Sequence, residues 1–278
     1  MKGKPIRADF HIHTSRSDGK VCGAEVVALA GAAGLDTLAI TDHDSVGALE
    51  EAAAEARRLG LRFVPGAELT AYQGTHEIHL LAYFPSLAAA RAEAFTQTLA
   101  RVQEARRTRL RKAVAALRLC GVLISESDVF HGGAESYGRL HLARAIVHAG
   151  FARSENEAFS KYLDDRSGTV PPLDIRPQSV VAQAHALGAL VFWAHPSPEE
   201  FARFADALVA AGIDGVETAN FRRVDATGRL TAAVRARGLL ESGGSDWHGS
   251  PAEPALGTHA VGPEIAERFL AALYRRAA

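Results

Sequence analysis

The chain has 278 residues, of which 47% are hydrophobic and 23% charged, and its formal net charge is -1. This composition suits a folded protein with a large buried core and excludes a fibrous or intrinsically disordered chain. The pI of about 6.9 provides no overall field that would draw the protein onto duplex DNA or an anionic membrane. Any recognition of a phosphate group must therefore be local.

Hydropathy and cysteine content predict a cytoplasmic protein. No apolar run reaches the roughly 18 residues that span a bilayer, and the first residues, MKGKPIRADFHIH, lack the apolar stretch of a secretory signal. Cys22 and Cys120 form no CxxC motif, so we expect two free thiols. Cys22 lies near a candidate metal ligand, but we expect a small buried side chain there in preference to a metal contact.

Short strand-like runs alternate with amphipathic helical runs in the first and last parts of the chain. The expected strands are residues 6–13, 37–41, 61–68, 77–84, 189–195, 214–219 and 239–246. Helices are expected at residues 23–33, after Asp44, at 198–211, at about 226–237 and from Pro263 onward. This order predicts βαβ units that form a parallel sheet or barrel covered by helices.

The strand pattern disappears between residues 84 and 189, where Ala, Leu and Arg-rich helical sequence takes over. The segment SGTVPPLDIRP, with Gly168 and several prolines, breaks the helical periodicity downstream. We therefore predict a discontinuous α/β domain at residues 1–86 and 173–278, interrupted by a helical insertion domain at residues 87–172.

Metal-competent side chains lie at the ends of most of the expected strands. Asp9, His11 and His13 alternate along an extended run, so their side chains point to one side. An HxH pair alone is weak evidence for a metal site, because histidines hydrogen-bonded in a protein core are common. The later strands add Asp18, His43, Glu68, His79, His195, Asp246 and His248. In parallel α/β folds such positions open on one face, and so many ionisable groups together require bound cations.

The segments HIHTSRSD, ITDHD, PGAELT, HEIHLLAY, WAHP and GGSDWH together resemble the polymerase and histidinol phosphatase (PHP) family of phosphoesterases. SYGRLHLARAIVHAG is similar to the TrpH-like subgroup, which removes phosphate from nucleoside 3',5'-bisphosphates and trims short RNA. The resemblance implies an α/β fold, a distorted (β/α)7-type barrel, with substrate contacts from the insertion. It also implies hydrolysis of phosphate monoesters of small nucleotides through attack by a metal-bridging hydroxide.

The family pattern further implies a trinuclear metal site with Glu68 as the bridging ligand. The three sets are His11, His13, Glu68 and Asp246; Asp18, His43 and His248; and Glu68, His79 and His195. In part of the family a histidine stands where Asp18 is, and the additional anionic ligand favours Mn²⁺ or Fe²⁺ beside Zn²⁺. We expect two to three divalent ions, with Mn²⁺ favoured.

Further residues have candidate roles with an alternative beside each. Asp44 is a candidate catalytic residue that orients a ligand or the attacking water, and equally a candidate N-cap of the following helix. The resemblance implies that Arg139 and His141 bind substrate, and His141 is also a candidate catalytic residue. The alternative for both is an ordinary solvated helix start. Strand alternation puts Glu77 on the same face as His79, which favours His79 over His76 as the ligand.

The densest basic run is expected to be a solvated helix face, with attraction of a charged nucleotide as the alternative. It comprises Arg106, Arg107, Arg109, Arg111 and Lys112. The aromatic candidates for contact with a base are Phe130, Tyr137 and Phe221.

Three other functions compete with nucleotide phosphatase activity. A 5'-3' exonuclease or phosphodiesterase acting on short oligonucleotides would use the same site. A C–N hydrolase of the amidohydrolase type also places an HxH pair after the first strand, but it requires a metal-bridging lysine, and Lys161 is the only lysine after Lys112. The last alternative is a non-catalytic regulatory domain that metal ions merely stabilise.

Overall fold

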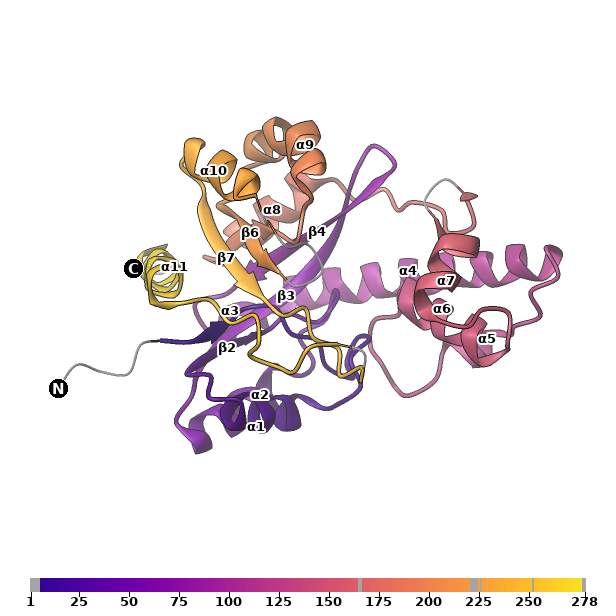
Figure 1. Ribbon diagram of the computed structural model, residues 1–278, viewed down its shortest axis with the longest axis horizontal. Helices are drawn as coiled ribbons and strands as arrows, with labels where there is room; N and C mark the ends of the chain where they lie inside the picture. Colours follow the sequence, from indigo (N-terminus) through magenta and orange to yellow (C-terminus); the bar gives the residue numbers. More distant parts are fainter. Residues whose placement is uncertain (1–5, 165–166, 221–224, 226, 252, 277–278) are drawn as a thin grey trace.

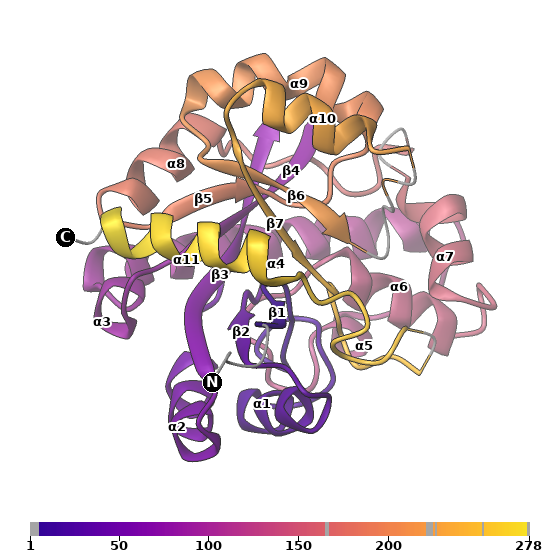
Figure 2. The same ribbon diagram turned by 60° about the vertical axis from the view of Figure 1, so that its left-hand side comes forward.

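The computed structural model describes residues 6–164, 167–220, 225, 227–251 and 253–276, and in them a 7-stranded sheet with strand order β1 to β7. The strands are β1 (Ala8–Asp9), β2 (Thr37–Ile40), β3 (Arg62–Gln73), β4 (His76–Tyr83), β5 (Leu190–Trp193), β6 (Gly215–Asn220) and β7 (Leu240–Gly244). Hydrogen bonds from Phe10 N to Gly243 O (3.1 Å) and from Asp246 N to His11 O (2.8 Å) bring the two edges together. The sheet is a nearly closed barrel (Figure 2), which confirms the α/β barrel prediction.

The expected all-parallel order is wrong at β4, which pairs antiparallel with both β3 and β5. β3 continues past Glu68 to Gln73 and turns at Gly74, whose φ of 66° is left-handed, directly into β4. A parallel connection requires a crossover of a dozen or more residues, and this tight turn makes a hairpin instead. His79 consequently enters the barrel mouth near the start of its strand.

Helices cover the outer face of the barrel and bury the largest apolar core. They are α1 (Gly23–Ala32), α2 (Leu49–Leu59), α8 (Pro177–His185), α9 (Pro198–Ala211) and α10 (Arg229–Ala236). Figure 1 shows α1 and α2 on one side of the sheet strands and α8 to α10 on the other. The sequence fixes the ends of α9: Ser197 and Glu200 form a capping box with Pro198 in the first turn, and Gly212 ends the helix at φ 97°.

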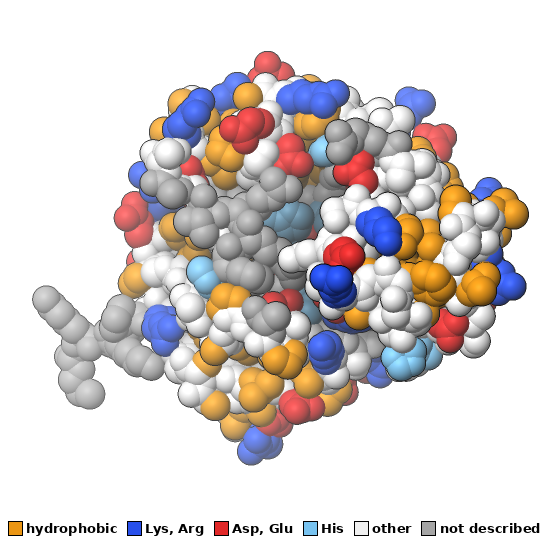
Figure 3. Space-filling view, turned by 45° about the vertical axis from the view of Figure 1, so that its right-hand side comes forward, with side chains coloured by type: hydrophobic (Ala, Val, Ile, Leu, Met, Phe, Trp, Pro, Cys, Tyr) orange, Lys and Arg blue, Asp and Glu red, His pale blue; other side chains and the backbone are white. Residues whose placement is uncertain are grey.

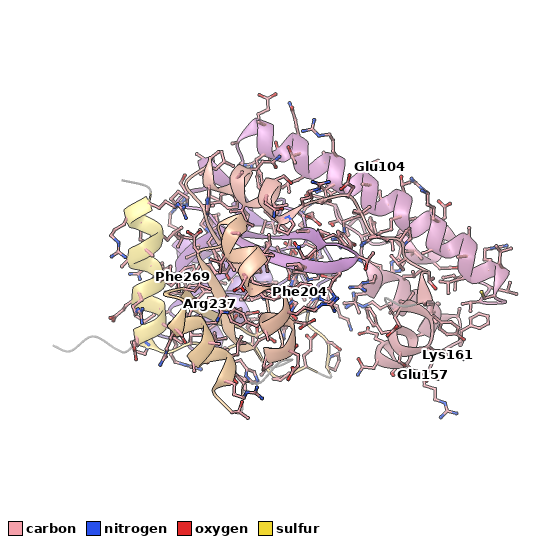
Figure 4. The ribbon with its side chains drawn as sticks, turned by 90° about the horizontal axis from the view of Figure 1, so that it is seen from above. Glu104, Glu157, Lys161, Phe204, Arg237 and Phe269 are labelled. Carbon is pink, nitrogen blue, oxygen red and sulfur yellow. The ribbon has the colours of Figure 1, made fainter. Side chains whose placement is uncertain are left out.

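An aromatic cluster and α11 (Pro263–Arg276) fill the end of the barrel opposite to the mouth that His79 enters. Phe269 of α11 stacks on Phe10 at 4.2 Å and meets Tyr83 edge to face at 4.8 Å. The Tyr83 hydroxyl donates to the Phe10 carbonyl at 2.9 Å. Figure 4 places Phe269 on the side of α11 that faces the barrel. Burial of each such ring stabilises the fold by about 1.5–3 kcal/mol. The predicted metal ligands lie at the opposite end of the barrel.

A helical region lies beside the barrel and has a core of its own. It contains α3 (Leu87–Ala90), α4 (Glu93–Leu119), α5 (Glu126–Val129), α6 (Arg139–His148), α7 (Glu155–Ala158) and the π-helix η1 (Phe159–Leu163). The core of this region begins at Leu110, whereas Phe95 and Leu99 of α4 pack into the main core. α4 therefore runs from the barrel into the helical region (Figures 1 and 4). Among the described residues, no helix has the length and apolar character needed to cross a membrane.

Candidate metal centre

The structure brings all of the predicted metal ligands together at the barrel mouth. Atoms within 4.8 Å of one another form the groups His13, Asp18, His43, His248; His11, Glu68, His195; His11, His13, Asp246; and His43, Glu68, His79. They reach the mouth from β3, from β4 and from the loops that follow β1, β2, β5 and β7. Figure 3 shows histidine and acidic side chains beside the hollow where the helical region meets the barrel.

Glu68 lies at the centre of this cluster. Its carboxylate oxygens lie 3.0–3.4 Å from ring nitrogens of His11, His13, His43, His79 and His195. The side chain is 1% exposed, yet neither oxygen has a hydrogen-bond partner of acceptable geometry. The cost of burying such an anion is offset only by charge from paired groups or metal ions.

The spacing of the donor atoms fits divalent metal ions. His11 Nε2 and His13 Nε2 are 3.2 Å apart, and Asp246 Oδ1 lies 3.1 Å from His13 Nε2. Asp18 Oδ1 lies 3.3 Å from His248 Nε2. Ligands bonded at about 2.0–2.2 Å to a common ion lie about this far apart, and imidazole with carboxylate suits Mn, Fe and Zn.

Backbone strain is concentrated at the same place. Among the described non-glycine residues, the left-handed region is occupied by Asp44 (φ 44°), His195 (36°) and Asp246 (49°). Each such residue costs roughly 1–3 kcal/mol and persists where the surrounding structure enforces it. On β7, a Cβ at Gly244 would lie 2.4 Å from His11 N, so glycine is required where β7 passes His11. These features turn the side chains of His195 and Asp246 into the mouth.

Carboxylates that the sequence analysis missed hold the predicted ligands in place. Glu217 Oε1 lies 3.1 Å from His11 Nδ1, and Glu217 Oε2 accepts from His195 N at 2.9 Å. Asp42 accepts from Thr14 N at 2.7 Å and from Ser17 Oγ at 2.6 Å, which fixes the loop leading to Asp18. A carboxylate on the far ring nitrogen sets the orientation and tautomer of a ligating histidine. For Glu217 the available signal was a carboxylate inside an expected strand, residues 214–219.

Asp9 plays a related part through the main chain. Its Oδ1 accepts from His11 N at 3.2 Å and from Ser245 N at 2.9 Å. Burial raises the pKa of Asp9 to about 6, against the lowering effect of these hydrogen bonds. Asp9 thus supports the backbone around His11.

Carboxylates raise the pKa of several histidines at the mouth. Burial alone would lower the pKa of His13, but Asp246, Glu68 and Asp18 raise it to about 10. Burial likewise opposes the effect of Glu68 and Glu77 on His79, whose pKa rises to about 9. Burial would raise the pKa of Glu68, yet the surrounding histidines hold it well below its usual range. Metal ions would compete with these protons for the same positions.

The N-cap interpretation of Asp44 is wrong. α2 begins at Leu49 with Ala48 as its N-cap and no side-chain cap. Asp44 Oδ1 accepts from Thr70 N at 2.9 Å, and Oδ2 accepts from Thr70 Oγ1 at 2.6 Å and from Arg106 Nη1 at 2.8 Å. Its carboxylate therefore anchors the loop that carries His43 to β3 and α4.

A cavity of about 200 Å³ opens above the cluster and brings Arg139, but not His141, into its wall. Its described lining is Asp18, His43, Glu68, Glu77, His79, Arg106, Gly138, Arg139, Leu140, Phe159, His195, Asp246 and His248. Arg139 is the first residue of α6, and its Nη2 lies 3.7 Å from Glu77 Oε2. His141 Nδ1 instead accepts from Gly138 N at 3.1 Å, and burial lowers the pKa of His141 to about 4.

Several secondary expectations are wrong. Arg106 and Arg109 of the basic run are 3% and 2% exposed, so the run is not one solvated face, although Arg111 is exposed. Cys22 is exposed, not buried, while both cysteines are free as expected.

The aromatic candidates do not line the cavity where the structure describes them. Tyr137 is 5% exposed and packs edge to face on Phe130 at 5.2 Å in the core of the helical region. Phe221 lies outside the described residues. Phe159, at the start of η1, lines the cavity and was not anticipated.

Comparison with known proteins agrees with this site. Residues 9–148 match the PHP domain family. A 3',5'-nucleoside bisphosphate phosphatase from Chromobacterium violaceum is 31% identical over 258 residues, which cover 86% of each chain. The 5'-3' exoribonuclease Rnm from Escherichia coli is 32% identical over 256 residues, 86% of this chain and 84% of that protein. A structure from Bifidobacterium adolescentis, described as a candidate metal-dependent phosphoesterase, has a TM-score of 0.83 at 28% identity and covers 95% of this chain and 96% of its own.

The chain therefore belongs to the PHP family. It is a metal-dependent phosphoesterase, as the sequence resemblance implied, and the regulatory and C–N hydrolase alternatives are set aside. Lys161 agrees with this conclusion, because it is exposed on η1 with its Nζ 4.8 Å from the Tyr162 ring.

Proposed function

We propose that the protein hydrolyses phosphate monoesters of small nucleotides, most specifically nucleoside 3',5'-bisphosphates. The observation that carries this proposal is a single cavity whose wall contains both the His, Asp and Glu cluster and Arg139. Charged and polar side chains converge on this one space, as they do in small-molecule sites. The similarity to the Chromobacterium violaceum phosphatase supports the same substrate class.

The proposal includes a site for two to three divalent ions, with Mn²⁺ favoured because several ligands are carboxylates. The proposed ligands are His11, His13, Asp18, His43, Glu68, His79, His195, Asp246 and His248. Bound ions supply charge that neutralises phosphoryl oxygens and lower the pKa of the attacking water. Glu68, which faces ring nitrogens on several sides, is the proposed bridging ligand.

The chain's own residues orient this donor set. Glu217 accepts from Nδ1 of His11, which leaves Nε2 directed at Glu68 and Asp246. Glu77 is placed to accept from Nε2 of His79, 3.3 Å away, which leaves Nδ1 directed at Glu68, 3.0 Å away. These contacts select the tautomers that present lone pairs to the cluster.

Arg139 is the proposed phosphate-binding residue. A guanidinium binds two phosphate oxygens at once, and the N-terminus of α6 adds a favourable dipole. Since α6 belongs to the proposed insertion domain, residues 87–172, this domain would supply the substrate contacts. A nucleotide with two phosphates could then place one over the cluster and the other against Arg139.

The test is release of inorganic phosphate from nucleoside monophosphates and 3',5'-bisphosphates. We expect turnover with Mn²⁺, preference for the bisphosphates, and complete loss with chelator. A metal-loaded protein that hydrolyses no phosphate ester would contradict the proposal.

A second candidate is 5'-3' exonuclease activity on short RNA. An adjoining cavity of about 160 Å³ shares Glu77, His79, Arg139 and His195 with the first, which extends the site beyond the cluster. The similarity to the Escherichia coli exoribonuclease supports it. Gel analysis of a 3'-labelled short RNA would separate the two functions, because stepwise shortening from the 5' end requires diester cleavage.

A further inference from the structure

Two buried arginines on α4 suggest a role beyond support of the fold. Arg106 and Arg109 are 3% and 2% exposed, and their i, i+3 spacing puts them on one face of the helix. Burying a guanidinium is costly unless it makes specific charged contacts. α4 crosses from the barrel to the helical region (Figure 4). The contacts of Arg106 and Arg109 place these side chains where the two regions meet.

Arg106 contacts a carboxylate next to a proposed metal ligand. Its Nη1 donates to Asp44 Oδ2 at 2.8 Å and to Thr70 Oγ1 at 2.5 Å. Asp44 follows His43 directly in the chain. On its other side, Arg106 Nε donates to the Tyr137 carbonyl at 2.9 Å. One guanidinium therefore joins the His43 loop to the segment that leads into α6.

Arg109 repeats this arrangement at β4. Its Nη1 contacts the Tyr72 hydroxyl and donates to Glu77 Oε2 at 3.1 Å. The other oxygen of Glu77 lies 3.3 Å from His79 Nε2. Glu77 Oε2 also lies 3.7 Å from Arg139 Nη2. A single buried carboxylate thus connects a proposed metal ligand, the α4 arginine and the proposed phosphate-binding arginine.

Both connections join the same two parts of the molecule. On the barrel side, His43 Nδ1 and His79 Nδ1 each lie 3.0 Å from the central Glu68. On the helical side, both connections end in residues 137–139. The close fit of this segment is visible at Gly138, where a Cβ would lie 2.6 Å from Arg106 Nη2.

We propose that Arg106 and Arg109 are positioning residues that hold the proposed substrate-binding segment in register with the metal centre. Through Asp44 and Glu77 they orient the His43 loop and His79, and through Tyr137 and Glu77 they orient Arg139. This proposal rests on the proposed function for its substrate side. Its metal side is independent of any substrate.

The test compares Arg106→Met, Arg109→Met and the conservative Arg109→Lys with Arg111→Met as matched control. Arg111 is on the same helix, but it is exposed and pairs with Glu104 and Glu126. Metal-free proteins are titrated with Mn²⁺ by calorimetry, and metal-loaded proteins are assayed with adenosine 3',5'-bisphosphate and with p-nitrophenyl phosphate. Thermal unfolding is recorded for every variant.

We expect the Arg106 and Arg109 variants to weaken Mn²⁺ binding and to raise KM for the bisphosphate, each by about tenfold or more. KM for p-nitrophenyl phosphate should change by less than about threefold, because this compound lacks the second phosphate that Arg139 would bind. Arg109→Lys should show a smaller effect, since lysine keeps the charge without the planar fork. Arg111→Met should match the wild type.

The positioning role would be overturned if the arginine variants lower Tm but leave the Mn²⁺ affinity and KM unchanged. The arginines would then be structural contacts only. If the methionine variants do not fold, Arg109→Lys supplies the comparison. If the wild type hydrolyses no phosphate ester, the proposed function fails, and the Mn²⁺ titration by itself still decides the positioning role.

Discussion

The barrel mouth and the helical region supply the cavity with different kinds of residue. The mouth contributes histidines and carboxylates. They lie close to the strained backbone of His195 and Asp246, and His11 and His195 donate fixed hydrogen bonds to Glu217. The helical region contributes Arg139 from α6, supported by a separate apolar core. Chemistry at phosphorus requires fixed geometry, whereas recognition of varied substrates can be changed on an inserted segment. We infer that the mouth determines the reaction and the helical region the substrate.

The largest effect should come from Glu68→Gln, in the mouth. The neutral amide cannot bridge cations, and the histidines around it lose their central anion. We expect kcat/KM to fall by about a thousandfold or more, with loss of bound metal, because metal-ion catalysis supplies several kcal/mol. Elemental analysis and phosphate release measure the two effects. Glu104→Gln, at an exposed site on α4, is the control and should retain both.

The barrel mouth could be predicted from the sequence more completely than the helical region. The ligand positions were predictable because each follows or lies within a strand, and strand ends meet at one face. Glu217 was missed because it lies inside β6, and the sequence does not show that this strand places it against His11. The direction of β4 was missed because it depends on the tight turn at Gly74.

In the helical region the sequence predicted helices but not which faces are buried. Arg106 and Arg109 look like members of one basic run with Arg111, and only packing against Asp44 and Glu77 separates them. The role of a charged helical residue depends on tertiary neighbours that helical periodicity does not specify. Arg139 was found through family resemblance, and periodicity alone would have left it as a helix start.

A smaller and more selective effect should follow from Arg139→Met. If the helical region determines the substrate, this variant should raise KM for a nucleoside 3',5'-bisphosphate by about ten- to a hundredfold, because a charged hydrogen-bonded contact contributes about 1.5–3 kcal/mol. kcat should change much less. Steady-state kinetics on the bisphosphate and the matching monophosphate measure the difference. An equal fall of kcat for both compounds would instead place Arg139 in the chemistry and weaken the comparison.

The smallest effect concerns His141, and it depends on pH. Burial lowers the pKa of the folded-state His141 to about 4 from its ordinary value of 6.5. Between these values the unfolded chain binds a proton that the folded chain excludes, so the free energy of unfolding falls as pH decreases from about 6.5 toward 4. At pH 5 this loss should be about 2 kcal/mol. His141→Gln can still accept from Gly138 N at the third position of α6 and should remove the loss.

Urea unfolding of both metal-free proteins at pH 7 and pH 5 measures this difference, since the mouth histidines are common to both and cancel. A variant whose stability relative to the wild type does not rise at pH 5 would contradict the capping role. The same variant also tests the candidate catalytic role. If His141 only caps α6 outside the cavity wall, kcat of the variant at pH 7 should stay within about threefold of the wild type. Loss of a general acid or base would instead lower kcat by about 100-fold or more. A loss of that size would show that His141 takes part in the reaction and is more than a structural residue of the helical region.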